Sequence, residues 1–81
     1  MQLYYVHILQ SKKSPSNYYT GFTEDVEKRL KAHNDGQALH TKKHKPWVLK
    51  TAILFINKQK ALRFEKYLKT ASGRAFAKKR F

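Results

Sequence analysis

Blocks of apolar side chains, separated by short turn-forming stretches, divide this chain into three predicted strands. Residues 3–10 (LYYVHILQ) are rich in β-branched and aromatic types, with apolar side chains at both odd and even positions. This pattern is typical of a strand that is covered on both faces. Residues 18–22 (YYTGF) form a second predicted strand, and the SKKSPSN segment before it predicts a hairpin with a long basic loop. The third predicted strand is residues 47–56 (WVLKTAILFI).

A helix is predicted between the second and third strands. Residues 24–35 carry an apolar stripe at the i, i+4, i+7 spacing of a core-facing helix, made of Val26, Leu30 and His33. Thr23 is the expected N-cap, with Glu24 and Asp25 in the first turn, and Gly36 is the expected stop. Residues 37–45 (QALHTKKHK) follow as a basic loop.

A second helix is predicted from the capping Asn57 to about Thr70, with Ala61, Glu65 and Leu68 on one face. Ser72 and Gly73 are expected to break it before a short basic end. The element order is then β-β-α-β-α-α, which predicts an α+β fold with a three-stranded antiparallel sheet and flanking helices. We expect residues 1–81 to fold as a single domain with a small core.

The charge of the chain is the first indication of its function. The chain has 18 Lys and Arg against 5 Asp and Glu, and 13 of the cations lie in residues 36–81 beside a single acid, Glu65. So strong an imbalance favours a polyanionic partner, DNA or RNA. A weaker alternative is a basic adaptor for an acidic protein or a membrane surface.

Other features of the sequence exclude functions or locations by their absence. The chain has no cysteine, which fits a cytoplasmic location, and its apolar N-terminal run is too short to span a bilayer. No membrane partner is therefore expected, and the oligomeric state is taken as monomeric. Patterns for zinc proteases, P-loops and nucleophile elbows are missing, which leaves zinc, nucleotide-hydrolase and acyl-transfer functions without support.

Glu65 is the one carboxylate with a candidate chemical role. Helical spacing allows an ion pair with Lys69, and a carboxylate among phosphate-binding cations could equally hold Mg²⁺. Spacing alone leaves both interpretations open. Most of the tyrosines at 4, 5, 18 and 19 fit ordinary strand positions, and His33 by itself fits a core histidine.

Four sequence landmarks together resemble the GIY-YIG nuclease family. They are YVH at 5–7, YTG at 19–21, Arg29 within DVEKRLKAHNDG, and FEKYLK around Glu65. The run covers nearly the whole chain and is most similar to small stand-alone members, and more distantly to the nuclease domains of excision-repair and intron-homing endonucleases.

The resemblance implies a role for each matching residue. Tyr19 would be the general base that activates water, Arg29 would bind phosphate oxygens, and Glu65 would hold one Mg²⁺ or Mn²⁺ ion. His33 would orient Tyr19 or a phosphate. His7, also expected to be catalytic, stands where the family's first motif has the tyrosine that supports the nucleophile network. Imidazole can donate or accept a hydrogen bond as well, so a change in rate or pH dependence is expected. For His7 to meet Tyr19, odd residues of the hairpin must pair with odd ones.

The leading hypothesis is a metal-dependent DNA endonuclease, in DNA repair or recombination, that hydrolyses a phosphodiester by in-line water attack. The alternative is a non-catalytic DNA- or RNA-binding module on the same fold. In either case the phosphate backbone would be held without base reading by Lys42, Lys43, Lys45, Lys69, Arg74, Lys78, Lys79 and Arg80.

Overall fold

The computed structural model describes all 81 residues and contains the predicted three-stranded antiparallel sheet. The strands are β1 (Tyr4–Ser11), β2 (Tyr18–Thr23) and β3 (Trp47–Phe55). Their order in the sheet is β2-β1-β3, so the first strand is central and the other two form the edges. The burial of β1 on both faces follows from this central place, as its sequence pattern predicts.

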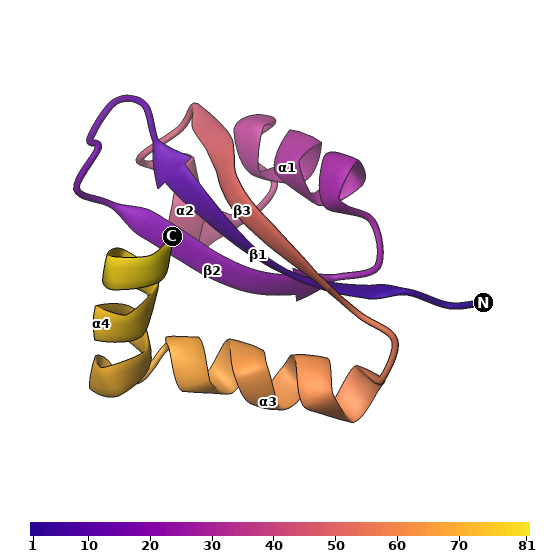
Figure 1. The fold of residues 1–81 in the computed structure, drawn as a ribbon. Coiled ribbons are helices and arrows are strands. Elements are labelled where there is room, and N and C mark those ends of the chain that lie inside the picture. Colours follow the sequence, from indigo (N-terminus) through magenta and orange to yellow (C-terminus); the bar gives the residue numbers. More distant parts are fainter.

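Four helices surround the sheet, in the order expected apart from one extra short turn. They are α1 (Val26–Asn34), α2 (Leu39–Lys42), α3 (Lys58–Leu68) and α4 (Ala71–Arg80). Figure 1 shows α1 above the sheet and α3 below it. The four-residue α2 lies inside the segment predicted as a basic loop. None of these helices is long and apolar enough to cross a membrane.

The apolar core lies between the sheet and α3. Even-numbered side chains of β1, Val6 and Ile8, pack there against Ala61 and Leu68 of α3. Odd-numbered side chains of β1 point to the opposite face, toward α1, because neighbouring side chains alternate along a strand. The α1 face therefore receives Tyr5, His7 and Leu9.

Helix ends differ from the sequence prediction at two places. Asp25, not Thr23, caps α1 by accepting a hydrogen bond from the backbone N–H of Lys28, while the Thr23 hydroxyl bonds to the backbone of Asp25. The helix thus starts later than expected, since the Thr23 hydroxyl is already engaged in a local turn. The predicted cap Asn57 is confirmed, because its side chain accepts from the N–H of Lys60.

The second difference concerns the C-terminal end, which is a ten-residue helix. Ser72 and Gly73 were expected to break the preceding helix, but both lie in the first turn of α4, and the break falls at Thr70, the N-cap. Gly73 is needed for close packing instead. A Cβ at this position would lie 1.8 Å from the carbonyl oxygen of Tyr67.

Candidate active site

Three aromatic rings predicted for the site meet on the α1 face of the sheet. His7 comes from β1, Tyr19 from β2 and His33 from α1. The ring centroids of Tyr19 and His33 are 4.6 Å apart, and His7 lies 6.2 Å from Tyr19 and 6.3 Å from His33. We call these three side chains the ring cluster. Sequence positions separated by up to 26 residues are thus brought into contact.

Strand register produces this meeting. His7 pairs with Gly21, and Leu9 pairs with Tyr19, so odd residues of β1 face odd residues of β2. Side chains of matching parity share a face of the sheet. The register that the sequence analysis required for His7 to meet Tyr19 is therefore the register of the structure.

Gly21 makes room for two of the rings. A Cβ at this position would lie 2.8 Å from Cε1 of His7 and 3.0 Å from Cε2 of Tyr19. The first distance is shorter than carbon atoms tolerate and the second is unusually tight, so a side chain here would displace the His7 ring and press on Tyr19. The glycine of the YTG segment is required by packing, and its backbone conformation has no positive φ.

A buried hydrogen-bond network orients His33, which is fully buried. Its Nδ1 lies 2.6 Å from the hydroxyl oxygen of Thr41 in α2. The single hydroxyl proton of Thr41 points to the carbonyl of Ala38, so we assign the ring proton to Nδ1 of His33, which donates to Thr41. This tautomer leaves Nε2 of His33 as a free acceptor, and it has no hydrogen-bond partner.

The same network ties α2 to the rest of the fold. The indole nitrogen of Trp47, at the start of β3, donates to the carbonyl of Thr41 at 2.8 Å. Asn34, at the end of α1, binds both the backbone N–H and the carbonyl of Trp47. The short helix α2 is therefore held against α1 and β3, and its threonine is held against the site histidine.

Both histidines of the cluster resist protonation. The pKa of His7 is lowered from 6.5 to about 4, first by burial and then by the charges of His33, Arg29 and Lys69, in that order of importance. Burial, and then the charge of Arg29, also lowers the pKa of His33. Both imidazoles are neutral at pH 7. Arg29, the predicted phosphate-binding residue, lies on α1 one turn before His33, and its charge acts on both rings.

Glu65 lies on α3, which covers the opposite face of the sheet. Its carboxylate is 3.0 Å from the ammonium group of Lys69, and only 20% of its side chain is exposed. This is the ion pair that helical spacing allowed. The charge of Lys69 also lowers the pKa of His7, as the smallest of four causes. Glu65 is the single carboxylate of this region, and no group of three or more His, Cys, Asp or Glu side chains forms a protein-only metal cage.

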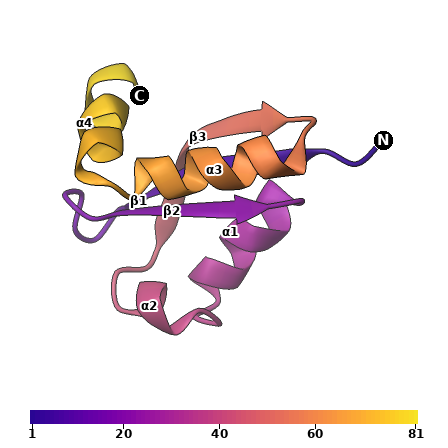
Figure 2. The same ribbon diagram turned by 90° about the horizontal axis from the view of Figure 1, so that it is seen from below.

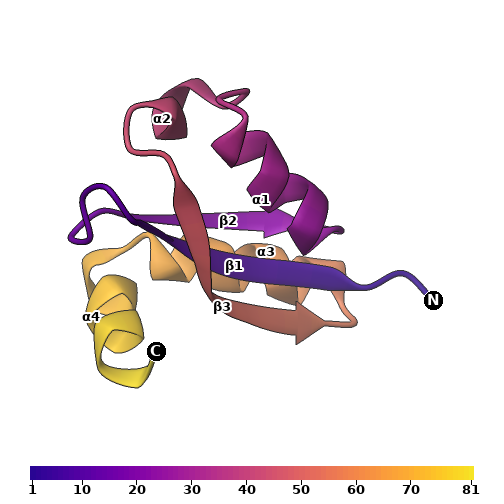
Figure 3. The same cartoon turned by 90° about the horizontal axis from the view of Figure 1, so that it is seen from above.

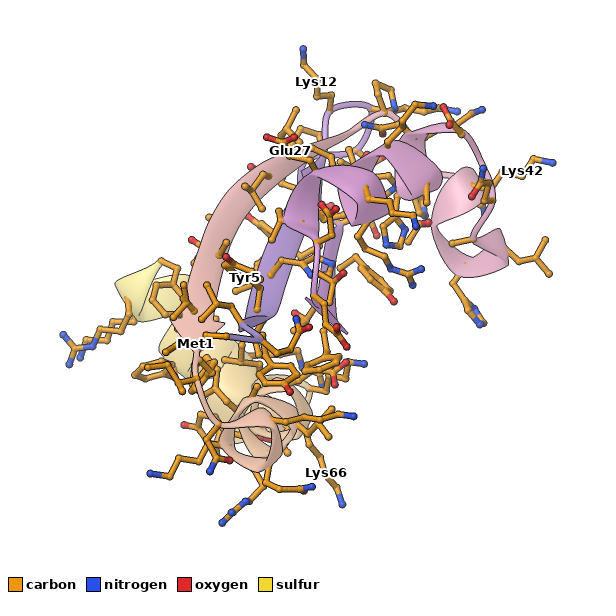
Figure 4. All side chains as sticks on the ribbon, turned by 90° about the vertical axis from the view of Figure 1, so that its right-hand side faces the viewer. Met1, Tyr5, Lys12, Glu27, Lys42 and Lys66 are labelled. Carbon is orange, nitrogen blue, oxygen red and sulfur yellow. The ribbon has the colours of Figure 1, made fainter.

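The predicted phosphate-binding cations are all exposed and fall into two groups. One group, in and after α2, is Lys42, Lys43 and Lys45. The other, at the end of α3 and along α4, is Lys69, Arg74, Lys78, Lys79 and Arg80. Figures 2 and 3 show α2 and α4 near the same end of the sheet but on opposite sides of it. Figure 4 shows Lys42 extending outward from α2.

Comparison with known proteins agrees with this geometry. A family model described as the GIY-YIG catalytic domain matches residues 3–80. This chain belongs to the GIY-YIG catalytic-domain family. It is 40% identical over 73 residues to a "UPF0213 protein" of Staphylococcus haemolyticus, covering 89% of this chain and 87% of that protein.

Two further proteins are similar to this GIY-YIG domain. The solution NMR structure of a UPF0213 protein from Bacillus halodurans superimposes with a TM-score of 0.57 at 35% identity, covering 94% of this chain and 80% of the other. A protein of Scheffersomyces stipitis named structure-specific endonuclease subunit SLX1 is 39% identical over 69 residues, which cover 76% of this chain and 20% of that protein.

Sequence reasoning missed the residues that hold the GIY-YIG site in place. The sequence pattern predicts only a loop at Thr41, a helix end at Asn34 and a strand start at Trp47. They bind through buried hydrogen bonds between elements, and no periodic pattern marks such bonds. The one available signal was an unexplained tryptophan at the start of a strand, since a buried indole N–H needs an acceptor.

Proposed function

We propose that this protein is a divalent-metal-dependent endonuclease that hydrolyses DNA phosphodiester bonds by in-line attack of water. The observation that carries the proposal is the ring cluster, in which Tyr19 lies against a neutral, oriented His33 within the field of Arg29. The family of the chain supplies the reaction class.

Tyr19 is proposed as the general base. In its deprotonated form, the phenolate oxygen would take the proton of the attacking water as the new P–O bond forms and the bond to the leaving oxygen breaks, and the leaving oxygen would take a proton from solvent. Nε2 of His33 is an unprotonated acceptor in the same cluster and can accept a hydrogen bond there. Arg29 would bind the phosphate oxygens, on which negative charge grows in the transition state.

The donor set fits one Mg²⁺ or Mn²⁺ ion bound mainly through water and substrate. Such ions take one or two carboxylates and complete their shell with water and phosphate oxygens, so the single carboxylate of Glu65 suffices as the protein ligand. When bound, the ion would polarise the scissile phosphate. Lys69, now paired with Glu65, would be free to move to a phosphate.

The test is cleavage of supercoiled plasmid and labelled oligonucleotides with Mg²⁺, Mn²⁺ or EDTA. We expect metal-dependent cutting that Glu65→Ala abolishes and that Glu27→Ala, which removes an exposed carboxylate of α1, leaves intact. Tyr19→Phe should lower the cleavage rate by about 100-fold or more, the usual value of a general base. Its DNA affinity should stay unchanged.

The neighbouring substitution Tyr18→Phe is the matched control and should cut like the wild type. If Tyr19→Phe cuts equally well, the assignment of the base is wrong. Salt-sensitive binding without cutting under any condition would establish the second candidate, a binding module. That candidate is favoured by His7, a buried ring whose two nitrogens have no hydrogen-bond partner, at the place of the family's tyrosine.

A further inference from the structure

A groove of about 600 Å³ lies between α4 and the sheet, beside the ring cluster. Tyr19 is one of the residues that line it. The apolar residues Ile8, Leu68 and Ala77 also line it. Its cations come from β3, α4 and the α3–α4 junction, and they are Lys50, Lys69, Arg74 and Lys78. No Asp or Glu is among the lining residues, so the groove combines an apolar surface with positively charged side chains.

Aromatic rings at the groove are exposed to an unusual degree. Tyr18 is 51% exposed and Phe81 is 37% exposed, although both line the groove. The amide group of Gln10 donates to the hydroxyl of Tyr18 at 3.3 Å, which holds the ring in place. The ammonium group of Lys50 lies 4.6 Å from the centre of the Tyr18 ring, so one face of this ring already attracts a cation.

A strand irregularity directs Lys50 to this position. Ile8 of β1 pairs with Thr51 and Leu9 pairs with Leu49, which leaves Lys50 as an extra residue in β3. Such bulges change the direction of a side chain and often occur beside functional sites. Lys50 reaches across the central strand to Tyr18 on the far edge strand of the sheet.

We propose that this groove binds an unpaired nucleobase of the substrate strand, next to the phosphate to be cut. A cationic groove with exposed aromatic rings is the arrangement that binds single strands, whose bases stack on the rings while cations follow the backbone. In an intact duplex the base faces are already stacked, so only a single-stranded, gapped or branched substrate can fill the groove. The position of the base relative to the cut rests on the proposed function, whereas the binding of the base does not.

Binding is measured with EDTA present, so that no cleavage is involved. Three fluorescent ligands are compared by anisotropy: an oligothymidylate, an abasic strand of equal length and charge, and a blunt duplex. The variants are Tyr18→Ala and Tyr18→Phe. Because Tyr18 is half-exposed, both are expected to fold.

Loss of the ring should affect only ligands with unpaired bases. Tyr18→Ala is expected to weaken oligothymidylate binding about tenfold, within the range measured for stacking on one aromatic side chain. Its affinity for the abasic strand and the duplex should stay within about twofold, and Tyr18→Phe should keep the affinity of the wild type. Equal losses for all three ligands, or no loss for any, would overturn the proposal.

A second pair of variants keeps the test decisive if Tyr18→Ala does not fold. Lys50→Gln removes a groove cation, and Lys58→Gln removes an exposed lysine at the other end of α3. Lys50→Gln should reduce the salt dependence of single-strand binding by about 0.7 in the log–log slope, the value for one phosphate contact. Equal slopes for the two variants would contradict the groove. If the protein does not cut DNA but the variants show these losses of binding, the proposed endonuclease function is wrong and the base-binding groove still stands.

Discussion

At the scale of single residues, His7 is the clearest unfavourable feature of the structure, because its polar ring is buried without hydrogen bonds. This imidazole is 1% exposed, and neither of its nitrogens has a hydrogen-bond partner. A buried polar group in this state is unfavourable and strongly prefers to be neutral. The ring is therefore neutral and enclosed, and its neighbours in the ring cluster are Tyr19 and His33.

Acid should destabilise the protein through His7. The folded-state pKa of His7 is about 4 against 6.5 when unfolded, so between these values the unfolded chain binds a proton that the folded chain does not. Stability is then complete above pH 6.5 and falls as the pH is lowered to 4, by about 3 kcal/mol. Urea unfolding between pH 4 and 7 measures this loss.

Replacing His7 should reduce the dependence of stability on pH. His7→Gln is expected to lose most of the pH dependence, with a remainder from His33, whose pKa is also lowered. His40→Gln, at an exposed histidine of α2, should keep the full dependence of the wild type. A His7→Gln profile as steep as that of the wild type would contradict the burial argument.

Gly21 offers a test of the packing around the rings. Gly21→Ala places a methyl group 2.8 Å from His7 and 3.0 Å from Tyr19, so the rings must shift. We expect a loss of about 1 to 3 kcal/mol in urea unfolding, typical of overpacking, together with slower cleavage. Gly36→Ala should also lose stability, because Gly36 has a φ of 77°, but should cut at the normal rate. Equal cleavage rates for both variants would refute the proposed role of Gly21.

At the scale of elements, short side-chain hydrogen bonds decide where helices begin. The hydroxyl of Thr70 accepts from the N–H of Gly73 and donates to the carbonyl of Tyr67, so it ends one helix and starts the next. Ser72 and Gly73, the stronger breakers by residue type, lie within α4. Local propensity is overridden because α4 packs closely against the end of α3.

The cap at Thr70 should be measurable. Thr70→Ala is expected to cost about 1 kcal/mol in urea unfolding, the usual value of an N-cap. Ser72→Ala, two residues further on, should be neutral or slightly stabilising, since alanine is the better helix former. If Ser72→Ala proved the more costly of the two, the helix boundary would be wrong.

At the scale of the whole molecule, the fold places two groups of cationic side chains around one site. Lys42 is the last residue of α2 and Lys43 is its C-cap, and Thr41 of this helix binds His33. Arg74 and Lys78 line the groove with Tyr19. The two cationic groups lie on opposite sides of the same end of the sheet (Figures 2 and 3). A nucleic acid that passes over Tyr19 would meet both groups.

Salt dependence tests this arrangement. Replacing Lys42, Lys43 and Lys45 together with Gln should lower the log–log slope of duplex binding by about 2.7, the value for three phosphate contacts. Replacing Lys58, Lys60 and Arg63 with Gln makes the same change of charge on the exposed part of α3. This control should change the slope much less. Equal changes would mean that only net charge matters.

Much of this protein can be predicted from its sequence, because the signals are local. Apolar blocks and helical spacing predicted the sheet, the order of elements and the fold class. Parity along strands predicted which side chains share a face, and the structure confirms that His7 and Tyr19 do. The landmarks around Tyr19, Arg29 and Glu65 predicted the family, and the match over residues 3–80 confirms it.

Tertiary structure decided what depends on contacts between distant segments. The bulge at Lys50 changes which residues of β3 face α3, and this follows from pairing with β1, not from the pattern of residues 47–56. The bond between Thr41 and His33 joins two elements whose approach no periodicity encodes. Helices and strands depend mainly on neighbouring residues. The register of β3, the tautomer of His33 and the groove beside Tyr19 depend on contacts between distant segments, so they form only in the folded chain.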